Sequence, residues 1–225
     1  MKRPSMRKLV SSTLALAFVA CAGTAWSQAP SGEERIEPTR WKFVKQESGP
    51  VNYYSVVEEA GLSFIRAQYK PGYDTAVYGY PFPEADRGRV RKIRWSWRAM
   101  TLPNGGDECA DGKEDSAAVV YVTWKRGLRW YSIKYVWSGV GTKGRTCGRK
   151  RSPFVAQDTV IVDSGAPLNT WKTVEIDVKA EFRAHFEDND QNADVPDLLG
   201  IAIMTDGDQT KSESAADYGA FVITR

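Results

Sequence analysis

The sequence predicts an all-β protein, a two-layer antiparallel β-sandwich of jelly-roll type with one short helix. Three observations predict this class. Apolar and polar residues alternate along residues 93–99 and again along 131–137, the pattern of strands with one buried face. Residues 117–124 are apolar on both faces, as expected of a central strand covered on both sides. Further short apolar runs, separated by turn residues, fill the rest of the chain.

The remaining elements follow in chain order. A strand pair is predicted at 52–57 and 62–69 around a turn at 58–61, and further strands at 75–80, 158–162, 171–178, 198–204 and 217–224. Gly127–Leu128 is predicted to be the two-residue turn between the two longest strand runs. Val178, Phe182 and Phe186 recur with helical spacing, which predicts a helix over 177–186 that Asp177 caps.

The N-terminus has the pattern of a signal peptide over residues 1–27. A basic start precedes an apolar run at 9–22 and the small residues Ala25 and Ser27, so we expect cleavage after Ser27, with Ala25 as the alternative. A third possibility is a lipoprotein anchored through Cys21. Residues 28–40 are predicted to be a flexible lead-in and 41–225 a single domain. The protein is therefore expected to be periplasmic or secreted.

Removal of residues 1–27 changes the charge. The whole chain has 31 Lys and Arg against 28 Asp and Glu, and the leader holds four of the basic residues and no acid. The mature chain therefore carries a net charge of −1, which argues against a nucleic-acid partner. Its other apolar runs are too short to span a bilayer.

Two cysteines remain in the mature chain, Cys109 and Cys147, and the favoured prediction is a disulfide between them. The alternative is two free buried thiols, and their spacing matches no zinc or redox motif. Cys109 lies in an acidic connection, 103–116, and Cys147 in a basic one, 140–153. We expect the two connections to neutralise each other, in preference to forming an anion site.

A series of short motifs follows one order along residues 41–225. They are WSWR at 95–98, LP at 102–103 with a GDE loop, DSAAVVY at 115–121, YVWS at 135–138, Trp171, the predicted helix, GIAIMTDGD at 200–208 and YG at 218–219. In sequence and spacing they resemble the bacterial secreted family catalogued as domain of unknown function 3047. The cysteine pair and the insertion 188–194 depart from that family's pattern. The resemblance implies no assigned activity; its pattern is similar to the jelly-roll sandwiches of carbohydrate-binding modules.

Two acidic stretches could bind a ligand or a metal. Asp206 and Asp208 close an apolar strand, where their carboxylates could coordinate a hard cation or hydrogen-bond sugar hydroxyls; the alternative is a turn built on Gly207. A second stretch places oxygen ligands at alternate positions, like the start of a calcium loop, but it lacks the turn glycine and the closing glutamate. Its residues are Asp188, Asp190, Asn192 and Asp194, and a solvated acidic loop is the favoured interpretation.

Catalysis has one candidate set. Glu175, Asp177 and Glu181 are similar to the carboxylate strand of laminarinase-like glycoside hydrolases, although the last spacing is one residue too long and a helix is predicted to start at Asp177. Trp124 and Trp130 are surplus aromatics expected on the outward face of the sheet, where they could stack on sugar rings.

The sequence therefore predicts a non-catalytic module that binds a glycan or a cell-envelope polymer, with no cofactor other than a possible calcium ion. A carboxylate-dependent glycoside hydrolase is the first alternative, and a protein-interaction or structural envelope protein is the second.

Overall fold

The computed structural model describes residues 32–46 and 52–225, which form two β-sheets packed face to face. Sheet A has the order β11 (Lys172–Asp177), β6 (Lys92–Thr101), β13 (Ser214–Thr224), β4 (Leu62–Tyr69) and β3 (Tyr54–Glu59), and β1 (Glu33–Ile36) also pairs with β13. Sheet B has the order β2 (Lys42–Gln46), β5 (Ala76–Pro81), β12 (Asp197–Met204), β7 (Ser116–Arg126), β8 (Arg129–Ser138), β10 (Val155–Ser164) and β9 (Thr146–Arg151).

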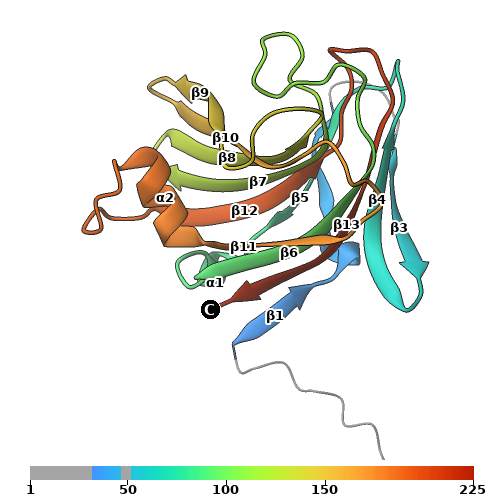
Figure 1. Cartoon of the computed structure of the whole chain (residues 1–225). Helices are drawn as coiled ribbons and strands as arrows, with labels where there is room; N and C mark the ends of the chain where they lie inside the picture. The colour runs from blue at the N-terminus through green and yellow to red at the C-terminus, as the bar shows by residue number, and fades with distance from the viewer. Residues whose placement is uncertain (1–31, 47–51) are drawn as a thin grey trace, which may run out of the picture.

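The chain passes repeatedly from one sheet to the other, which gives the jelly-roll connectivity (Figure 1). Neighbouring strands are antiparallel except β8 and β10, which pair in parallel through the register Trp130 to Val155. The predicted fold class, a two-layer sandwich of jelly-roll type, is confirmed.

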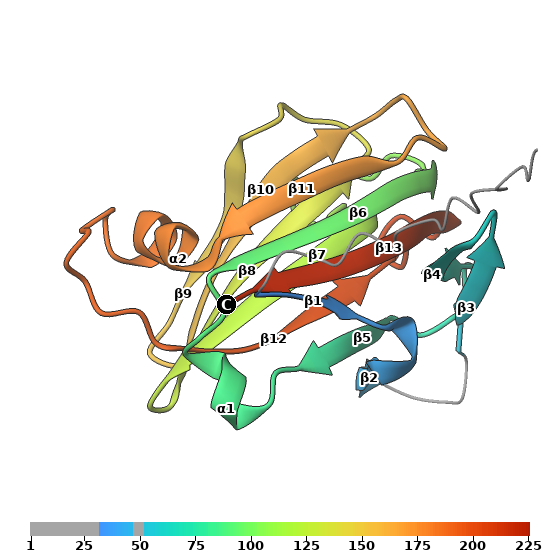
Figure 2. The same ribbon diagram turned by 90° about the horizontal axis from the view of Figure 1, so that it is seen from below.

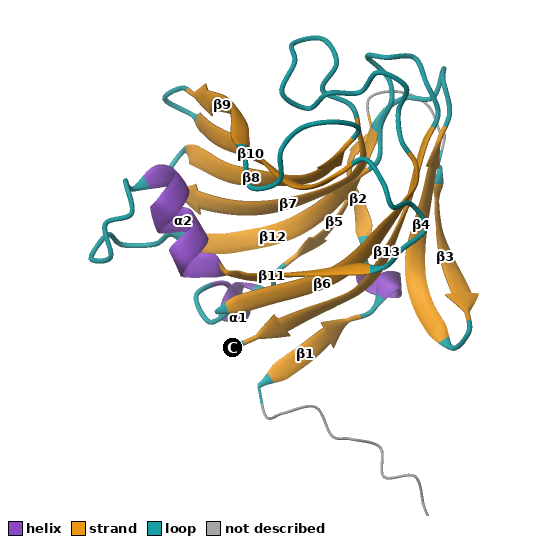
Figure 3. Cartoon of the chain, in the orientation of Figure 1, coloured by secondary structure: helices purple, strands orange, loops and turns teal. Residues whose placement is uncertain are grey.

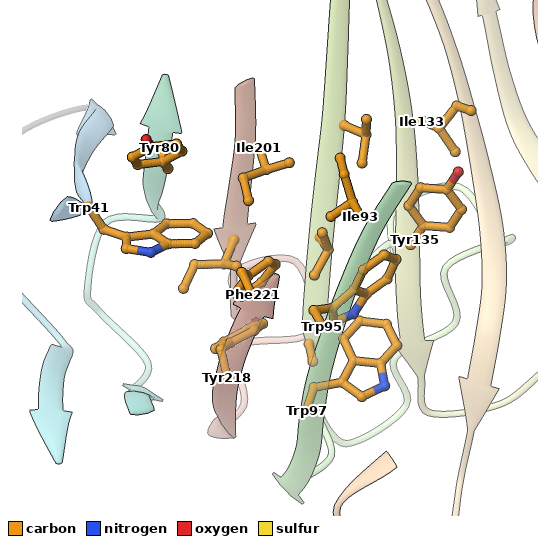
Figure 4. Close-up of a cluster of buried hydrophobic side chains, with 14 of the residues drawn as sticks. Trp41, Tyr80, Ile93, Trp95, Trp97, Ile133, Tyr135, Ile201, Tyr218 and Phe221 are labelled. Carbon is orange, nitrogen blue, oxygen red and sulfur yellow. The ribbon is translucent and has the colours of Figure 1, made fainter. Parts of the chain in front are cut away.

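Aromatic side chains from both sheets fill the space between the layers. Trp95 and Trp97 from β6 point inwards beside Tyr218 and Phe221 from β13 and Tyr135 from β8 (Figure 4). Trp95 meets Trp97 edge-on, is tilted against Tyr135 at 5.5 Å between centroids, and stacks with Phe221. Because these aromatics are almost wholly removed from water, they supply much of the hydrophobic stabilisation of the fold.

Helix α2 (Val178–Phe186) covers one end of the sandwich, and most of the long loops gather at the opposite end (Figure 3). Asp177 caps the helix by accepting hydrogen bonds from the backbone N–H groups of Lys179 and Ala180, as predicted. Phe182 is fully buried and contacts Trp124 and Tyr131, so the helix closes the core at this end. The second view shows α2 and the hairpin of β3 and β4 at opposite ends of the molecule (Figure 2).

Most predicted strands are present within a few residues of their expected limits. The predicted turn at Gly127–Leu128 joins β7 and β8, whose flanking residues Arg126 and Arg129 are paired. Within the domain predicted at 41–225, three elements were not expected: β2, the single-turn helix α1 (Glu84–Arg87) and β9. Strand β9 lies within the basic connection, where its run of cationic residues hid the strand pattern.

Two predictions about connecting segments were wrong. Residues 33–40 of the predicted flexible lead-in form β1 and a 3-10 turn at Pro38–Arg40, because β1 completes the edge of β13. Within the described residues, no ion pair joins the acidic and basic connections; the cations Lys143, Arg149 and Arg151 instead pair with Asp163 and Asp158 of β10.

The predicted disulfide is confirmed: Cys109 and Cys147 are bonded, with their Cα atoms 5.5 Å apart. The predicted signal peptide at 1–27, its cleavage site and Cys21 lie outside the described residues. Among the helices in the described ranges, none has the length and apolar character needed to cross a bilayer.

Candidate functional site

The face of sheet B that turns away from the core carries a distinct set of side chains, and we call it the outer face of sheet B. Strand register places these residues in rows across β7, β8 and β10. The first row is Lys125, Trp130 and Val155; the second is Thr123, Ser132 and Gln157; the third is Tyr121, Lys134 and Thr159. An exposed aromatic end is therefore followed by hydroxyl and amide groups and then by a charged end.

The two tryptophans that the sequence singled out lie on opposite faces of this sheet. Trp130 is 45% exposed on the outer face, and the ammonium of Lys125 lies 4.8 Å from its ring centroid. The expectation for Trp124 was wrong, because its side chain points into the core and is fully buried against Phe182. Trp124 therefore cannot contact a ligand at the surface, and only Trp130 remains available for one.

A cavity of about 340 Å³ opens at the charged end of the outer face of sheet B, beneath the loop 102–115 that joins β6 to β7. Its lining is mostly polar: Thr75, Glu108, Glu114, Tyr121, Lys134, Gly148, Lys150, Gln157, Thr159, Met204, Asp206, Asp208 and Gln209. These residues come from five strands and three loops, so only the folded chain brings them together. The cavity is large enough to hold a small polar group or part of a larger ligand.

Lys134 and Glu108 form a buried ion pair in this cavity. The Lys134 ammonium donates to Glu108 Oε1, and the Ser116 hydroxyl donates to Glu108 Oε2 at 2.7 Å. Burial opposes the charge of Lys134, yet its pKa lies above the ordinary value because Tyr121, Glu108 and Asp206 surround it. Burial raises the pKa of Glu108, while Lys134 and Ser116 counteract that rise. Lys134 is therefore protonated and held in place at neutral pH.

Asp206 lies next to this pair, and in residues 32–46 and 52–225 no basic side chain bonds to it. Its carboxylate accepts the backbone N–H of Ser116 at 3.2 Å, and its residue is almost fully buried. Burial raises the pKa of Asp206 to about 8, and the negative charges of Glu108 and Asp115 add to the effect, whereas Lys134 works against it. At neutral pH Asp206 is therefore mostly an uncharged acid that can donate a hydrogen bond.

Asp115 and Asp208 adjoin Asp206, and oxygen atoms of the three carboxyl groups lie within 4.8 Å of one another. Asp115 accepts the backbone N–H of Thr210 at 2.7 Å and its hydroxyl at 2.6 Å. Burial and the negative charge of Asp115 raise the pKa of Asp208. These oxygens are of the type that binds hard cations, so this cluster is where the described residues could hold one.

The acidic loop that resembled a calcium site is not organised in this way. In the ranges that the structure describes, the carboxylates of Asp188, Asp190 and Asp194 do not approach one another closely enough to hold an ion together. Asp190 instead accepts the backbone N–H of Asn192 at 2.9 Å, which is a local turn. The calcium site at these residues stays a prediction of the sequence.

The three carboxylates proposed for catalysis each bond to a different part of the molecule. Glu175 lies on the exposed face of β11, where Lys92 donates to it at 2.9 Å. Asp177 caps α2, and Glu181 accepts the Tyr135 hydroxyl at 2.8 Å. Glu175 and Asp177 face solvent on sheet A, so the structure does not assemble these three residues around one cavity.

Sequence reasoning did not identify Glu108, Lys134 or Asp115 as parts of a site. Lys134 occupies the polar side of an alternating strand, which predicts an exposed lysine, but the loop 102–115 and the neighbouring strands bury it. Glu108 and Asp115 were noted only as members of an acidic connection. A usable signal was their position beside Cys109, since the disulfide restrains this loop near sheet B.

A family model described as a protein of unknown function (DUF3047) matches residues 39–222. The chain belongs to this family, as the motifs indicated. No curated protein matches the sequence.

Several solved structures are similar to this chain. The xyloglucanase domain of NopAA, a type three effector from Sinorhizobium fredii, solved with cellobiose, shares 12% identity with a TM-score of 0.45, covering 88% of this chain and 100% of that chain. CtCBM11 shares 14% identity with a TM-score of 0.42, covering 86% of this chain and 95% of that chain. Endoglucanase 3 of family GH12 from Trichoderma harzianum shares 9% identity with a TM-score of 0.44, covering 88% of this chain and 99% of that chain. We infer no activity or ligand from likenesses at this level.

Proposed function

We propose that this member of the DUF3047 family is a non-catalytic module that binds a glycan or another hydroxyl-rich envelope polymer along the outer face of sheet B. The observation that carries the proposal is the continuous row of groups from Trp130 to the Lys134 cavity. Lys134 follows Trp130 by four positions along β8, a distance of about 13 Å. An extended oligosaccharide could span it.

Each part of this face suits a sugar. The exposed ring of Trp130 offers an apolar surface for the C–H face of a pyranose. Thr123, Ser132 and Gln157 in the second row can both donate and accept hydrogen bonds with hydroxyl groups. Small residues flank them on β12, where Gly200 pairs with Thr123 and Ala202 with Tyr121. This side of the sheet is therefore low and leaves room for a ligand chain.

The charge state of the cavity also favours a neutral ligand. Lys134 and Glu108 neutralise each other, and Asp206 is mostly uncharged at neutral pH. The innermost groups thus supply donors and acceptors with little net charge. That arrangement suits hydroxyl groups and gives no advantage to a polyanion such as nucleic acid.

The experiment is a glycan array on the mature protein, run with and without calcium because of the Asp115, Asp206 and Asp208 cluster. For any glycan that binds, calorimetry compares the wild type with Trp130→Ala. We expect a loss of affinity of roughly tenfold, because an aromatic stacking contact is worth about 1 kcal/mol or slightly more.

Leu62→Ala is the matched control, since it truncates an exposed apolar side chain on the opposite sheet. Equal affinity of the wild type and Trp130→Ala would contradict the proposed surface. Binding to no glycan, together with clear binding to a protein partner, would favour an interaction module instead.

One observation favours a second function, a glycoside hydrolase. Asp206, with its pKa raised to about 8, could act as a general acid, and Glu108 offers a carboxylate in the same cavity. Reducing-sugar release from array-positive glycans tests this, and loss of release in Asp206→Asn would support it. An absence of release by the wild type would leave the binding module.

We also place the mature protein outside the cytoplasm. The leader-like N-terminus and the Cys109–Cys147 disulfide support this location, since disulfides persist in oxidising compartments. Fractionation of expressing cells into periplasm and cytoplasm tests it, and full retention in the cytoplasm would contradict it.

A further inference from the structure

The loop 102–115 is what converts the outer face of sheet B into a cavity. It has no helix or strand, and it passes from the end of β6 in sheet A to the start of β7 in sheet B. Glu108 projects from its tip, residues 107–114, onto Lys134, leaving only 7% of the Lys134 side chain exposed. The tip therefore covers one side of Lys134, while Tyr121, Thr159 and strand β9 line the cavity around it.

Apart from the packing of Cys109 against the sheet, the tip has few other attachments, and its polar ones centre on one residue. Its backbone hydrogen bonds are internal, for example Asp107 N–H to Lys113 O at 2.8 Å and Lys113 N–H to Ala110 O at 3.0 Å. Within the described residues, its hydrogen bonds and ion pairs to the sheets all involve Glu108, which reaches Lys134, Ser116 and Ser138. A single buried ion pair contributes little net stability, because desolvation offsets its attraction.

The disulfide is the one covalent attachment of the tip. It joins Cys109, next to Glu108, to Cys147 on β9, an edge strand that pairs only with β10. Both cysteine residues are partly exposed. The main core of the sandwich lies on the other face of sheet B, so breaking this bond removes no contact there. Cys109 does pack against a small apolar cluster on the outer side of the sheet, formed by Val119, Val136, Ile161 and Met204.

We propose that the Cys109–Cys147 disulfide is a redox latch that closes loop 102–115 over the Lys134–Glu108 pair. In the closed form a dithiol reductant can attack the disulfide. The S–S bond breaks, the dithiol gives up two electrons and two protons and becomes a disulfide, and Cys109 and Cys147 become thiols. The tip then moves away from β9, Glu108 separates from Lys134, and the cavity opens to solvent. This proposal does not depend on which ligand the cavity binds.

Amine acylation tests the latch without any ligand. The mature protein is treated with an N-hydroxysuccinimide acetate ester in two forms: oxidised, and reduced with dithiothreitol, alkylated at both thiols and desalted. Mass spectrometry measures the acetylation rate of each lysine. We expect the rate at Lys134 to rise at least about tenfold on reduction, because local opening exposes its amine.

Lys92 is the internal control, because it lies on the outer face of sheet A with its side chain 51% exposed and far from the latch. Its rate should be equal in both forms. Near-ultraviolet circular dichroism of the buried tryptophans reports whether the reduced protein keeps its core. The variant Cys147→Ser repeats the open form without alkylation, and Glu108→Gln in the oxidised protein should keep Lys134 protected because the loop remains tethered.

A protected Lys134 in reduced protein that retains its near-ultraviolet signal would overturn the latch. Loss of that signal on reduction would overturn it as well, since the disulfide would then support the whole fold. A selective rise at Lys134 with an unchanged core signal supports it.

Discussion

Two buried aspartates lie on opposite sides of the sandwich, Asp217 on the outer face of sheet A and Asp206 in the loop that follows β12 of sheet B, and their surroundings differ. On sheet A, Asp217 receives hydrogen bonds from Arg66 at 2.8 and 2.9 Å and from Arg98 at 2.8 Å. Asp206 is also buried, and among the described residues the hydrogen bond to its carboxylate comes from the backbone N–H of Ser116. One carboxylate is neutralised by two guanidinium groups, and the other is left without a bonded cation.

The difference shows which of the two aspartates is available to interact with a ligand. The Asp217 carboxylate on β13 pairs with Arg66 on β4 and Arg98 on β6, so its charge links these three strands. Asp206 instead holds a proton near neutral pH and lines a cavity. A buried acid without a bonded cation is costly to the fold, so its presence in the lining of a cavity points to a role in binding.

Removing the charge of Asp217 should have the largest effect. Asp217→Asn leaves two partly buried guanidinium groups without their carboxylate, and we expect a loss of about 3–5 kcal/mol in the free energy of unfolding. Urea denaturation followed by tryptophan fluorescence measures it. A loss below about 1 kcal/mol would show that the cluster is not structural and would break the comparison.

Asp206→Asn should behave differently and depend on pH. The pKa of Asp206 is about 8 in the folded state and 3.8 ordinarily, so between these values the folded state binds the extra proton. The stabilising contribution of this proton is complete below about pH 4 and is lost as pH rises through 8, by at most about 1.4 kcal/mol per pH unit. The wild type should therefore lose stability relative to the variant over this range, as measured by urea denaturation at several pH values. A difference that stays constant with pH would contradict the assignment.

The smallest effect is expected at the exposed carboxylate of sheet A. Glu175→Gln removes a solvent-exposed partner of Lys92, and such pairs contribute little because water screens them. The unfolding midpoint and the affinity for any array-positive glycan should both stay within error of the wild type. A large loss of binding or of sugar release in this variant would move the site to sheet A and restore the catalytic candidates Glu175, Asp177 and Glu181.

The architecture was predictable because it depends on local alternation. Residues 93–99 and 131–137 show one apolar face each, and β6 and β8 indeed bury those faces. The direction of Trp124 was not predictable in the same way. Strand β7 is apolar on both faces near its start, where loop 102–115 covers the outer side, so its pattern does not indicate which face meets the core.

The candidate site was only partly predictable, because its burial comes from residues distant in sequence. Asp206 and Asp208 were identified at the end of a strand, but their neighbour Asp115 lies about ninety residues earlier. Lys134 has the sequence pattern of an exposed lysine, and its burial depends on a loop whose position the disulfide sets. Trp130 could be predicted from the local strand pattern, and the disulfide from the two cysteines that remain in the mature chain.

One measurement tests most directly whether the ligand lies on sheet B. Each outer face carries one partly exposed tryptophan that can report binding: Trp130 on sheet B, and Trp171 on sheet A, where Arg98 lies 4.7 Å from its ring centroid. The protein is labelled with ¹⁵N, and the indole N–H signals are followed during titration with a glycan that binds on the array. We predict that the Trp130 signal shifts with the bound fraction while the Trp171 signal stays fixed. A shift of Trp171 with an unmoved Trp130 would contradict the account and place the ligand on sheet A.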